Sequence, residues 1–186
     1  MKKLKLRYSK FPVLHTARLS LREVTMKDKH EVFAMRSDKN LMRFIARPPA
    51  RSLKEAEDHV KMIRKSIRKN EIFHWGITLK GEKKVIGMIG FYRMVPEHYR
   101  TEVGYIMMGE YHGKGIMDEA LKAVLQFGFQ KIGFHQIEGI IDPRNKASEK
   151  LLLKNKFVRA AYFKENYFYA GKFLDSANYC LLNPGE

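Results

Sequence analysis

Three strand-like runs follow one another in the middle of the chain with no helical pattern between them. They cover residues 71–79, 84–93 and 102–108, and each is rich in β-branched, aromatic and other apolar residues. The connections are short, Lys80-Gly-Glu in the first case and a segment around Pro96 in the second. Runs of this kind with short turns between them predict an antiparallel meander at the centre of the fold.

Helix and strand patterns alternate on both sides of this meander, which indicates an α/β protein. The expected elements are a strand over 16–22, a helix capped by Thr25 and Asp28, a helix capped by Ser52 and Glu55, the meander, a helix over 117–131, a strand over 136–141, a helix over 146–155 and two strands that turn near Ala170 and Gly171. No internal repeat or shift in composition marks a boundary. We therefore expect a single domain over residues 1–186, with its core at about 16–183.

Composition restricts the setting of this domain. A chain of 186 residues with 45% apolar content can fill a core without staples, and its one cysteine, Cys180, cannot form an internal disulfide. No run approaches the ~20 apolar residues of a membrane span, and residues 1–7 place lysines where a signal peptide has its apolar core. The ten methionines join no cluster of His, Cys or carboxylate residues. We expect a soluble cytoplasmic protein with no metal and no membrane association.

The formal net charge of +16 favours acidic or phosphorylated partners. Much of this charge lies on one face of the helix that begins at Ser52, whose other face is apolar. The basic residues of that face are Lys54, Lys61, Arg64, Lys65, Arg68 and Lys69. A solvated face and a docking surface for RNA or a ribosome both remain open.

The chemistry-bearing segment is the turn over residues 110–117 (Glu-Tyr-His-Gly-Lys-Gly-Ile-Met), which joins a predicted strand to a predicted helix. Two glycines spaced by one residue let the main chain turn sharply with several N–H groups facing one point. The start of the helix adds partial positive charge, and Lys114 adds a full one. This turn predicts a phosphate site, although glycine pairs also occur in plain tight turns.

Two common nucleotide motifs do not fit the turn. A Walker loop needs Gly-x4-Gly-Lys-Ser/Thr, but Met108 occupies the first glycine position and Gly115 follows the lysine. A dinucleotide fingerprint needs a third glycine where Asp118 stands. ATP, GTP and NAD are therefore disfavoured as ligands.

The remaining pattern, (Gln/Arg)-x-x-Gly-x-(Gly/Ala), resembles the acyl-coenzyme A loop of the GNAT superfamily of N-acetyltransferases, with Glu110 departing from the first position. Further blocks are similar to its ribosomal-protein N-terminal acetyltransferase branch, and together they extend over about 160 residues in the same order. These blocks are residues 16–22, 101–105, 113–120, 142–145 and 164–175. The resemblance implies a GNAT fold, with a mixed, mostly antiparallel, splayed sheet and about four helices.

A cofactor site also follows from the resemblance. Acetyl-coenzyme A (acetyl-CoA) is the implied co-substrate, with its pantetheine arm lying between two strands that separate after a bulge near Ile106, Met107 and Met108. The pyrophosphate would lie on the amides of His112, Gly113, Lys114, Gly115, Ile116 and Met117. Asn145 would reach the pantetheine arm, although an asparagine at that place is also a common helix cap. We expect a bulky residue at Gly113 to weaken binding through a steric conflict.

The catalytic groups are also assigned by resemblance. Glu102 is the preferred general base, and Glu165 is a second candidate that would act as base or bind the acceptor ammonium. Many relatives use a tyrosine on the helix over 146–155 to protonate the departing sulfur, but leucines stand there, so Ser148 takes that place. Each of the three residues also has a non-catalytic interpretation. Glu102 would then be a solvated strand residue, Glu165 an exposed carboxylate and Ser148 a helix-cap serine.

The acceptor is expected to be a primary amine, with the N-terminal α-amine of a ribosomal protein leading. Its reference pKa of roughly 7.7–8.0, against about 10.4 for lysine, lowers the demand on a base. A polyamine or aminoglycoside is the enzymatic alternative, and a non-catalytic acyl-CoA sensor that binds ribosomes or RNA is the other. Residues 40–51 and the Pro96 segment should shape the acceptor side, where His74 is either core or wall. We expect a monomer or homodimer.

Overall fold

One mixed sheet of eight strands organises residues 3–185, which are the residues that the computed structural model describes; the expected domain ends at Met1 and Glu186 lie outside them. The strands are β1 (Leu14–His15), β2 (Leu19–Glu23), β3 (Phe73–Leu79), β4 (Gly87–Val95), β5 (Arg100–Met107), β6 (Gln136–Ile141), β7 (Val158–Tyr169) and β8 (Lys172–Leu182). Their spatial order is β1-β2-β3-β4-β5-β6-β8-β7, and only β5 and β6 pair in parallel. The predicted meander is therefore confirmed as β3-β4-β5.

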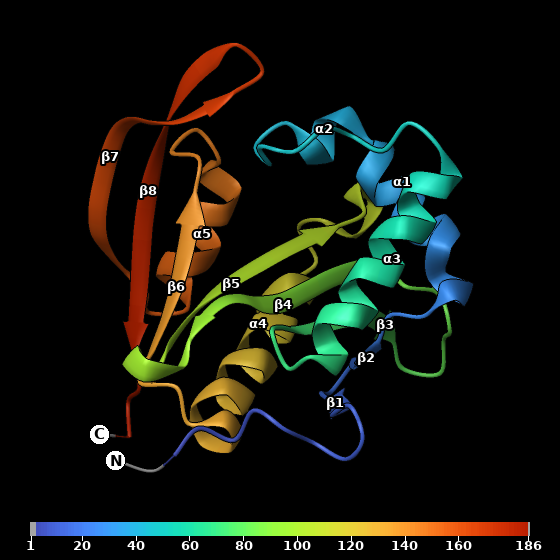
Figure 1. The fold of residues 1–186 in the computed structure, drawn as a ribbon, viewed down its shortest axis with the longest axis horizontal. Coiled ribbons are helices and arrows are strands. Elements are labelled where there is room, and N and C mark those ends of the chain that lie inside the picture. The colour runs from blue at the N-terminus through green and yellow to red at the C-terminus, as the bar shows by residue number, and fades with distance from the viewer. Residues whose placement is uncertain (1–2, 186) are drawn as a thin grey trace.

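Helices cover both faces of this sheet, with α3 in front and α4 behind in the view of Figure 1. Their bounds are α1 (Lys29–Ser37), α2 (Lys39–Met42), α3 (Leu53–Arg68), α4 (Ile116–Phe127) and α5 (Lys146–Lys154). One buried cluster joins α4 and Leu152 of α5 to the sheet, and a second joins α1 and α3 to the other side. The prediction of about four helices missed only the four-residue α2. No helix among residues 3–185 has the length and apolar character that a membrane crossing requires.

The predicted caps set where the helices before the meander begin. Thr25 and Asp28 form a reciprocal capping box at the short turn that leads into α1. Ser52 accepts the Glu55 N–H at 3.3 Å at the start of α3, while the Glu55 carboxylate accepts the N–H of Arg51. Both starts were predictable because a cap depends on residues only three or four positions apart.

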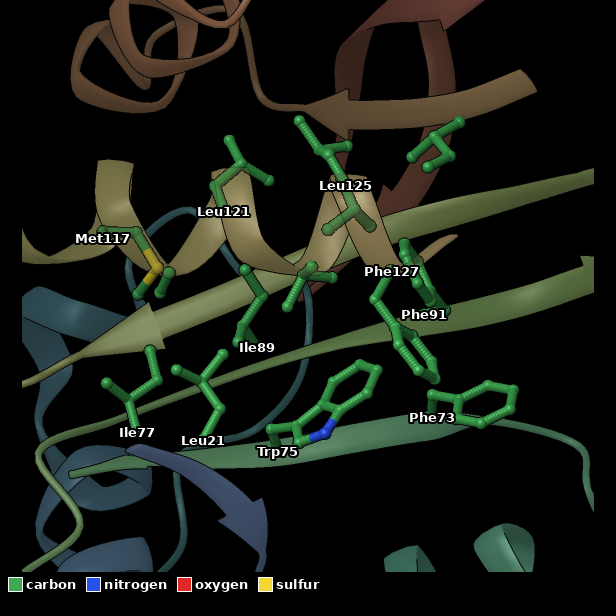
Figure 2. Close-up of a cluster of buried hydrophobic side chains, with 14 of the residues drawn as sticks. Leu21, Phe73, Trp75, Ile77, Ile89, Phe91, Met117, Leu121, Leu125 and Phe127 are labelled. Carbon is green, nitrogen blue, oxygen red and sulfur yellow. The ribbon is translucent and has the colours of Figure 1, made fainter. Parts of the chain in front are cut away.

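Aromatic packing fixes α4 against the sheet. Trp75 and Phe91 are fully buried, and the ring of Phe127 at the end of α4 lies edge-on to Trp75 with centroids 5.6 Å apart. The Trp75 indole N–H donates to the carbonyl of Pro12 at 2.8 Å, so burial leaves it satisfied. Figure 2 shows these rings together with Leu121 and Leu125 of α4 above β3 and β4. This packing determines where the N-terminus of α4 lies.

The β5–β6 pairing is short, and the sheet opens beyond it. Register pairs join Arg100 to Gln136, Thr101 to Ile137 and Glu102 to Glu138, and pairing ends there. Figure 1 shows the rest of β5 running away from β6. We call this opening the splay.

The prediction of a bulge near Ile106 to Met108 is wrong. The β4–β5 register is continuous from Gly87↔Met107 to Tyr92↔Glu102, and its shift lies between Tyr92 and Val95. The splay therefore arises because β6 leaves β5, while β5 stays paired with β4.

A substitution at Gly90 can test the tight packing of the meander. A Cβ at this position would lie 2.4 Å from the Phe73 carbonyl oxygen, whereas a Cβ at Gly109 would meet nothing within 4 Å. We expect Gly90→Ala to lower the free energy of unfolding by about 1–3 kcal/mol in urea titrations, because neither main-chain segment can yield easily. Gly109→Ala, the control, should change it by less than about 0.5 kcal/mol. Equal stability of the two variants would contradict this packing.

Candidate active site

The turn between β5 and α4 has the left-handed geometry that its two glycines predicted. Gly113 and Gly115 have φ values of 73° and 71°, and Gly115 is the N-cap of α4. Ile116 and Met117 bury their side chains in the core, so they offer only main-chain N–H groups to a ligand. Free N–H groups at the start of a twelve-residue helix suit an anionic group.

A polar clamp that sequence reasoning missed holds this turn in place. Glu119 on the first turn of α4 accepts hydrogen bonds from Thr16 Oγ1 at 2.5 Å, the Arg18 main-chain N–H at 2.8 Å and Arg18 Nε at 2.6 Å. The other end of the Arg18 guanidinium donates to the Lys114 carbonyl at 3.1 Å. Burial alone would raise the pKa of Glu119, but these hydrogen bonds outweigh it and hold the pKa below its usual value. Both partners lie in the blocks that carried the family resemblance, which was the available signal.

Main-chain groups of β5 point into the splay. The Met108 N–H donates to the Ile86 carbonyl at 2.9 Å, which sets the phase of the β4–β5 ladder. Because main-chain groups alternate in direction along an antiparallel strand, those of Val103, Tyr105 and Met107 face away from β4. Among the predicted cofactor residues 106–108, only Met107 therefore presents main-chain groups to the splay. His112 Nε2 donates to the Met107 carbonyl at 2.9 Å.

Two hydroxyl groups meet between β5 and α5. The Tyr105 hydroxyl lies 2.6 Å from Ser148 Oγ, and Ser148 is buried. Burial raises the pKa of Tyr105 to about 12, despite an opposing effect of the Ser148 hydrogen bond, so the phenol stays protonated at neutral pH. Asn145 caps α5, with its side-chain oxygen accepting the Ser148 N–H at 3.1 Å. Its amide nitrogen is left for the predicted contact with pantetheine.

Glu102 lies at the fork where β5 and β6 separate. Its carboxylate is 17% exposed and accepts a hydrogen bond from Arg93 at 2.6 Å. Burial raises the pKa of Glu102, although Arg93 opposes this shift. Tyr92 is its cross-strand neighbour, and burial also raises the pKa of this phenol. The fork thus holds a carboxylate that is a stronger base than an exposed glutamate, with Arg93 and Arg47 both opposing the rise in its pKa.

Glu165 stands apart from this fork, on the exposed β7–β8 hairpin at a φ of 52°. Its main-chain N–H donates to Asp175 Oδ1 at 2.8 Å. Asp175 also accepts from the Tyr162 hydroxyl, so this carboxylate fastens the irregular part of β7 to β8. The structure therefore places Glu102 at the end of the β5–β6 pairing and Glu165 on the arm beyond it.

A family model described as acetyltransferase (GNAT) domain matches residues 18–158. The chain belongs to the GNAT acetyltransferase family. This GNAT chain therefore uses acetyl-CoA as its acetyl donor and is an N-acetyltransferase. The predictions of fold, enzyme class and co-substrate are confirmed.

The GNAT chain has relatives of nearly its own length. It is 29% identical to the N-acetyltransferase YoaA of Bacillus subtilis (strain 168), over 95% of this chain and 99% of that protein. It is 28% identical to the [ribosomal protein uS5]-alanine N-acetyltransferase of Escherichia coli (strain K12), over 66% and 64%, and 22% identical to the spermidine N(1)-acetyltransferase of that strain, over 91% and 88%. The crystal structure of a GNAT acetyltransferase from Bacillus anthracis matches with a TM-score of 0.83 and 26% identity, covering 92% of this chain and 99% of that chain.

Acetyl-CoA fits the residues of this GNAT site. Its phosphates suit the amides of the α4 turn and the ammonium group of Lys114, which lies 5.6 Å from the centre of the Tyr111 ring. Its pantetheine amides suit the main-chain groups of β5 that face the splay. Within residues 3–185, no group of three or more His, Cys, Asp or Glu side chains is arranged to hold a metal ion.

The GNAT turn gives a prediction that corrects an expectation from sequence. A Cβ at Gly113 meets nothing within 4 Å, so the constraint is its positive φ and not a steric neighbour. We expect Gly113→Val to raise the dissociation constant of CoA about tenfold in calorimetry, since a left-handed β-branched residue costs about 1–2 kcal/mol. Gly109→Val, also in open space but without a positive φ, should bind CoA like the parent. Unchanged affinity of the Gly113 variant would place the phosphate site elsewhere.

Proposed function

We propose that this GNAT enzyme acetylates the N-terminal α-amine of a protein, with a ribosomal protein as the leading acceptor. The observation that carries the proposal is Glu102, a partly buried carboxylate at the fork, whose charged surroundings are mainly arginines. An α-amine needs only modest help from a base at neutral pH. The uS5-alanine acetyltransferase among the relatives supports the same class of acceptor.

In this proposal Glu102 accepts the proton of the attacking amine, directly or through one water. Its raised pKa brings it closer to that of the amine, and proton transfer of this kind contributes typically 10²–10⁴-fold to rate. Acetyl-CoA supplies an activated thioester carbonyl. Main-chain N–H groups of β5 that face the splay would donate to the carbonyl oxygen as negative charge develops on it.

Ser148 and Tyr105 would supply the proton that the departing sulfur takes up. The two hydroxyls already share a hydrogen bond, and the Tyr105 phenol holds its proton at neutral pH. Sequence reasoning proposed Ser148 alone. Tyr105 extends the path because it can return a proton to Ser148 and regain one from water, while a free thiol pKa of about 8.5 keeps the demand small.

The two alternatives to an N-terminal amine acceptor differ in their support. A purely sensory role is set aside by membership in an enzyme family, while a polyamine acceptor is favoured by the spermidine acetyltransferase relative. That acceptor needs carboxylates, and the groups acting on Glu102 include only one, Glu138, against two arginines. Docking of RNA or a ribosome on α3 stays a prediction, although Lys54, Lys61 and Arg64 of its basic face already pair with Asp58 or Glu23.

The role of Glu102 predicts a change in the pH profile. Because the base acts in its ionised form, kcat/KM should fall as pH drops through the raised pKa of Glu102. Arg93→Gln removes a cation that lowers this pKa, so the acid limb should move to higher pH. Glu102→Gln should lower kcat by about 10²-fold or more with CoA affinity unchanged. Rates are measured by thiol release with an N-terminal peptide from pH 5 to 9.

Glu138→Gln is the matched control for Glu102, since Glu138 is its register partner on β6 and pairs with Arg100 at 2.9 Å. It should keep most of the turnover. The free peptide amine titrates identically in all variants, so differences between their profiles belong to the enzyme. A Glu102→Gln enzyme with parental rates at every pH would remove Glu102 as the base.

The hydroxyl pair predicts a graded loss. Ser148→Ala should lower kcat by about tenfold and Tyr105→Phe by less, because the serine is the nearer donor in the proposed path. The effect should shrink with an acyl donor whose thiol has a lower pKa, since such a leaving group needs less protonation. Equal losses with both donors would indicate a structural role of the pair.

A further inference from the structure

We propose that the acceptor carries a carboxylate within a few residues of its reactive amine, and that Arg36 and Arg47 bind it. The inference rests on the proposed function and names the class of N-terminus that the enzyme selects. The two arginines lie on the side of the sheet covered by α1 and α3, with Arg36 at the end of α1 and Arg47 in the loop after α2. No part of the proposed proton transfer uses either of them.

Hydrogen bonds bring the loop of Arg47 to Arg36. Arg36 Nη2 donates to the Pro48 carbonyl at 3.4 Å, and the Ala50 N–H donates to the Arg36 carbonyl at 2.8 Å. Arg36 Nη1 lies 3.9 Å from the sulfur of Met42. These contacts hold the loop over residues 43–50 against the side chain and the main chain of Arg36 at the end of α1. Burial lowers the pKa of Arg36, and repulsion from Arg47 lowers it as well.

Neither arginine has an acidic partner among residues 3–185. Six other arginines in this part of the chain pair with carboxylates, in the pairs Arg18–Glu119, Arg22–Asp28, Arg64–Glu23, Arg93–Glu102, Arg100–Glu138 and Arg144–Asp142, while Arg7, Arg43, Arg51, Arg68 and Arg159 do not. Glu55 is the carboxylate that acts on Arg36 through space, and it is engaged with the Arg51 N–H at the start of α3. Two neighbouring guanidinium groups without an internal counter-ion are suited to a ligand carboxylate.

Two histidines on this side of the sheet are uncharged at neutral pH. Burial, with smaller contributions from Arg36 and Arg47, lowers the pKa of His59 to about 4. Burial lowers the pKa of His74 to about 3, and its ring lies 5.7 Å from that of Tyr92. His74 Nδ1 is fully buried and has no hydrogen-bond partner. A cationic acceptor would therefore meet two positive charges and two neutral histidines, with Glu102, Glu138 and Glu55 as the nearby carboxylates.

The position of these arginines relative to Glu102 sets where the carboxylate must be. Arg47 acts electrostatically on both Tyr92 and Glu102, and Arg36 acts on Tyr92. Tyr92 and Glu102 are cross-strand partners whose side chains share one face of the sheet, so an anion held by the arginines would lie on the same face as the amine that Glu102 deprotonates. An acidic side chain at the second or third residue of a protein N-terminus meets this requirement. The α-carboxylate of a free amino acid shares the chemistry but offers no further chain.

The test compares kcat/KM for matched peptides that begin Ala-Asp, Ala-Ser and Ala-Lys, together with free alanine, aspartate and spermidine. We expect the Ala-Asp peptide to exceed the Ala-Ser peptide by about tenfold or more and the Ala-Lys peptide to be poorest, with the differences shrinking at high salt. Arg47→Gln and Arg36→Gln should each lose most of the acidic preference and leave the Ala-Ser rate near parental on the pH plateau above the acid limb, which Arg47→Gln moves to higher pH. Arg47 is exposed, so its variant should fold even if that of Arg36 does not.

Arg43→Gln is the control, because Arg43 lies in the same loop with its guanidinium over the Phe44 ring at 4.5 Å. It should retain the acidic preference. Peptide acetylation at equal rates for all three sequences would overturn the inference and leave the proposed function standing. Turnover of free amino acids without peptides would overturn the N-terminal function and support carboxylate binding by the arginines. Preference for spermidine would overturn both.

Discussion

The parallel pairing of β5 and β6 ends after Glu102 and Glu138, and the site depends on that ending. Every other neighbouring pair of strands runs antiparallel and is held by the hairpins or by β8. If the two strands paired throughout, the main-chain groups of Tyr105 and Met107 would be satisfied by β6. Because β6 turns away to join β8, these groups face a space that an extended ligand arm can complete as a strand would.

The packed parts of the fold determine where the two ends of the extended ligand lie. At one end, Trp75 and Phe127 seat α4 on the sheet, and the Thr16, Arg18 and Glu119 contacts hold the glycine turn at its start. At the other end, the last β5–β6 pair holds Glu102 at the fork. The proposed phosphate site and the proposed base thus belong to one packed unit, so the distance between them does not rely on the exposed β7–β8 hairpin. That separation favours Glu102 over Glu165 as the base.

Sequence predicted what depends on neighbours along the chain. The caps at Thr25 and Ser52, the meander and the glycine turn all involve residues a few positions apart, and the family resemblance supplied the splay. The Tyr105–Ser148 pair, the Arg18–Glu119 clamp and the Arg36–Arg47 cluster join residues that only the fold brings together. The prediction of a bulge near Ile106 was wrong because a sheet can open through the departure of either strand. Sequence patterns do not say which of the two strands departs.

The net charge of +16 suggests binding to nucleic acid, but the local distribution of this charge matters more for the reaction. On α3 and β2, acidic side chains neutralise part of the basic surface. Near Glu102 the pattern reverses, since Arg36 and Arg47 are left without carboxylates while His59 and His74 are held neutral. A surplus of positive charge beside the base raises the free energy of a polycation there and lowers that of an acidic N-terminus. On the proposal made above, the same few side chains would favour an acidic protein N-terminus over a polyamine as the acceptor.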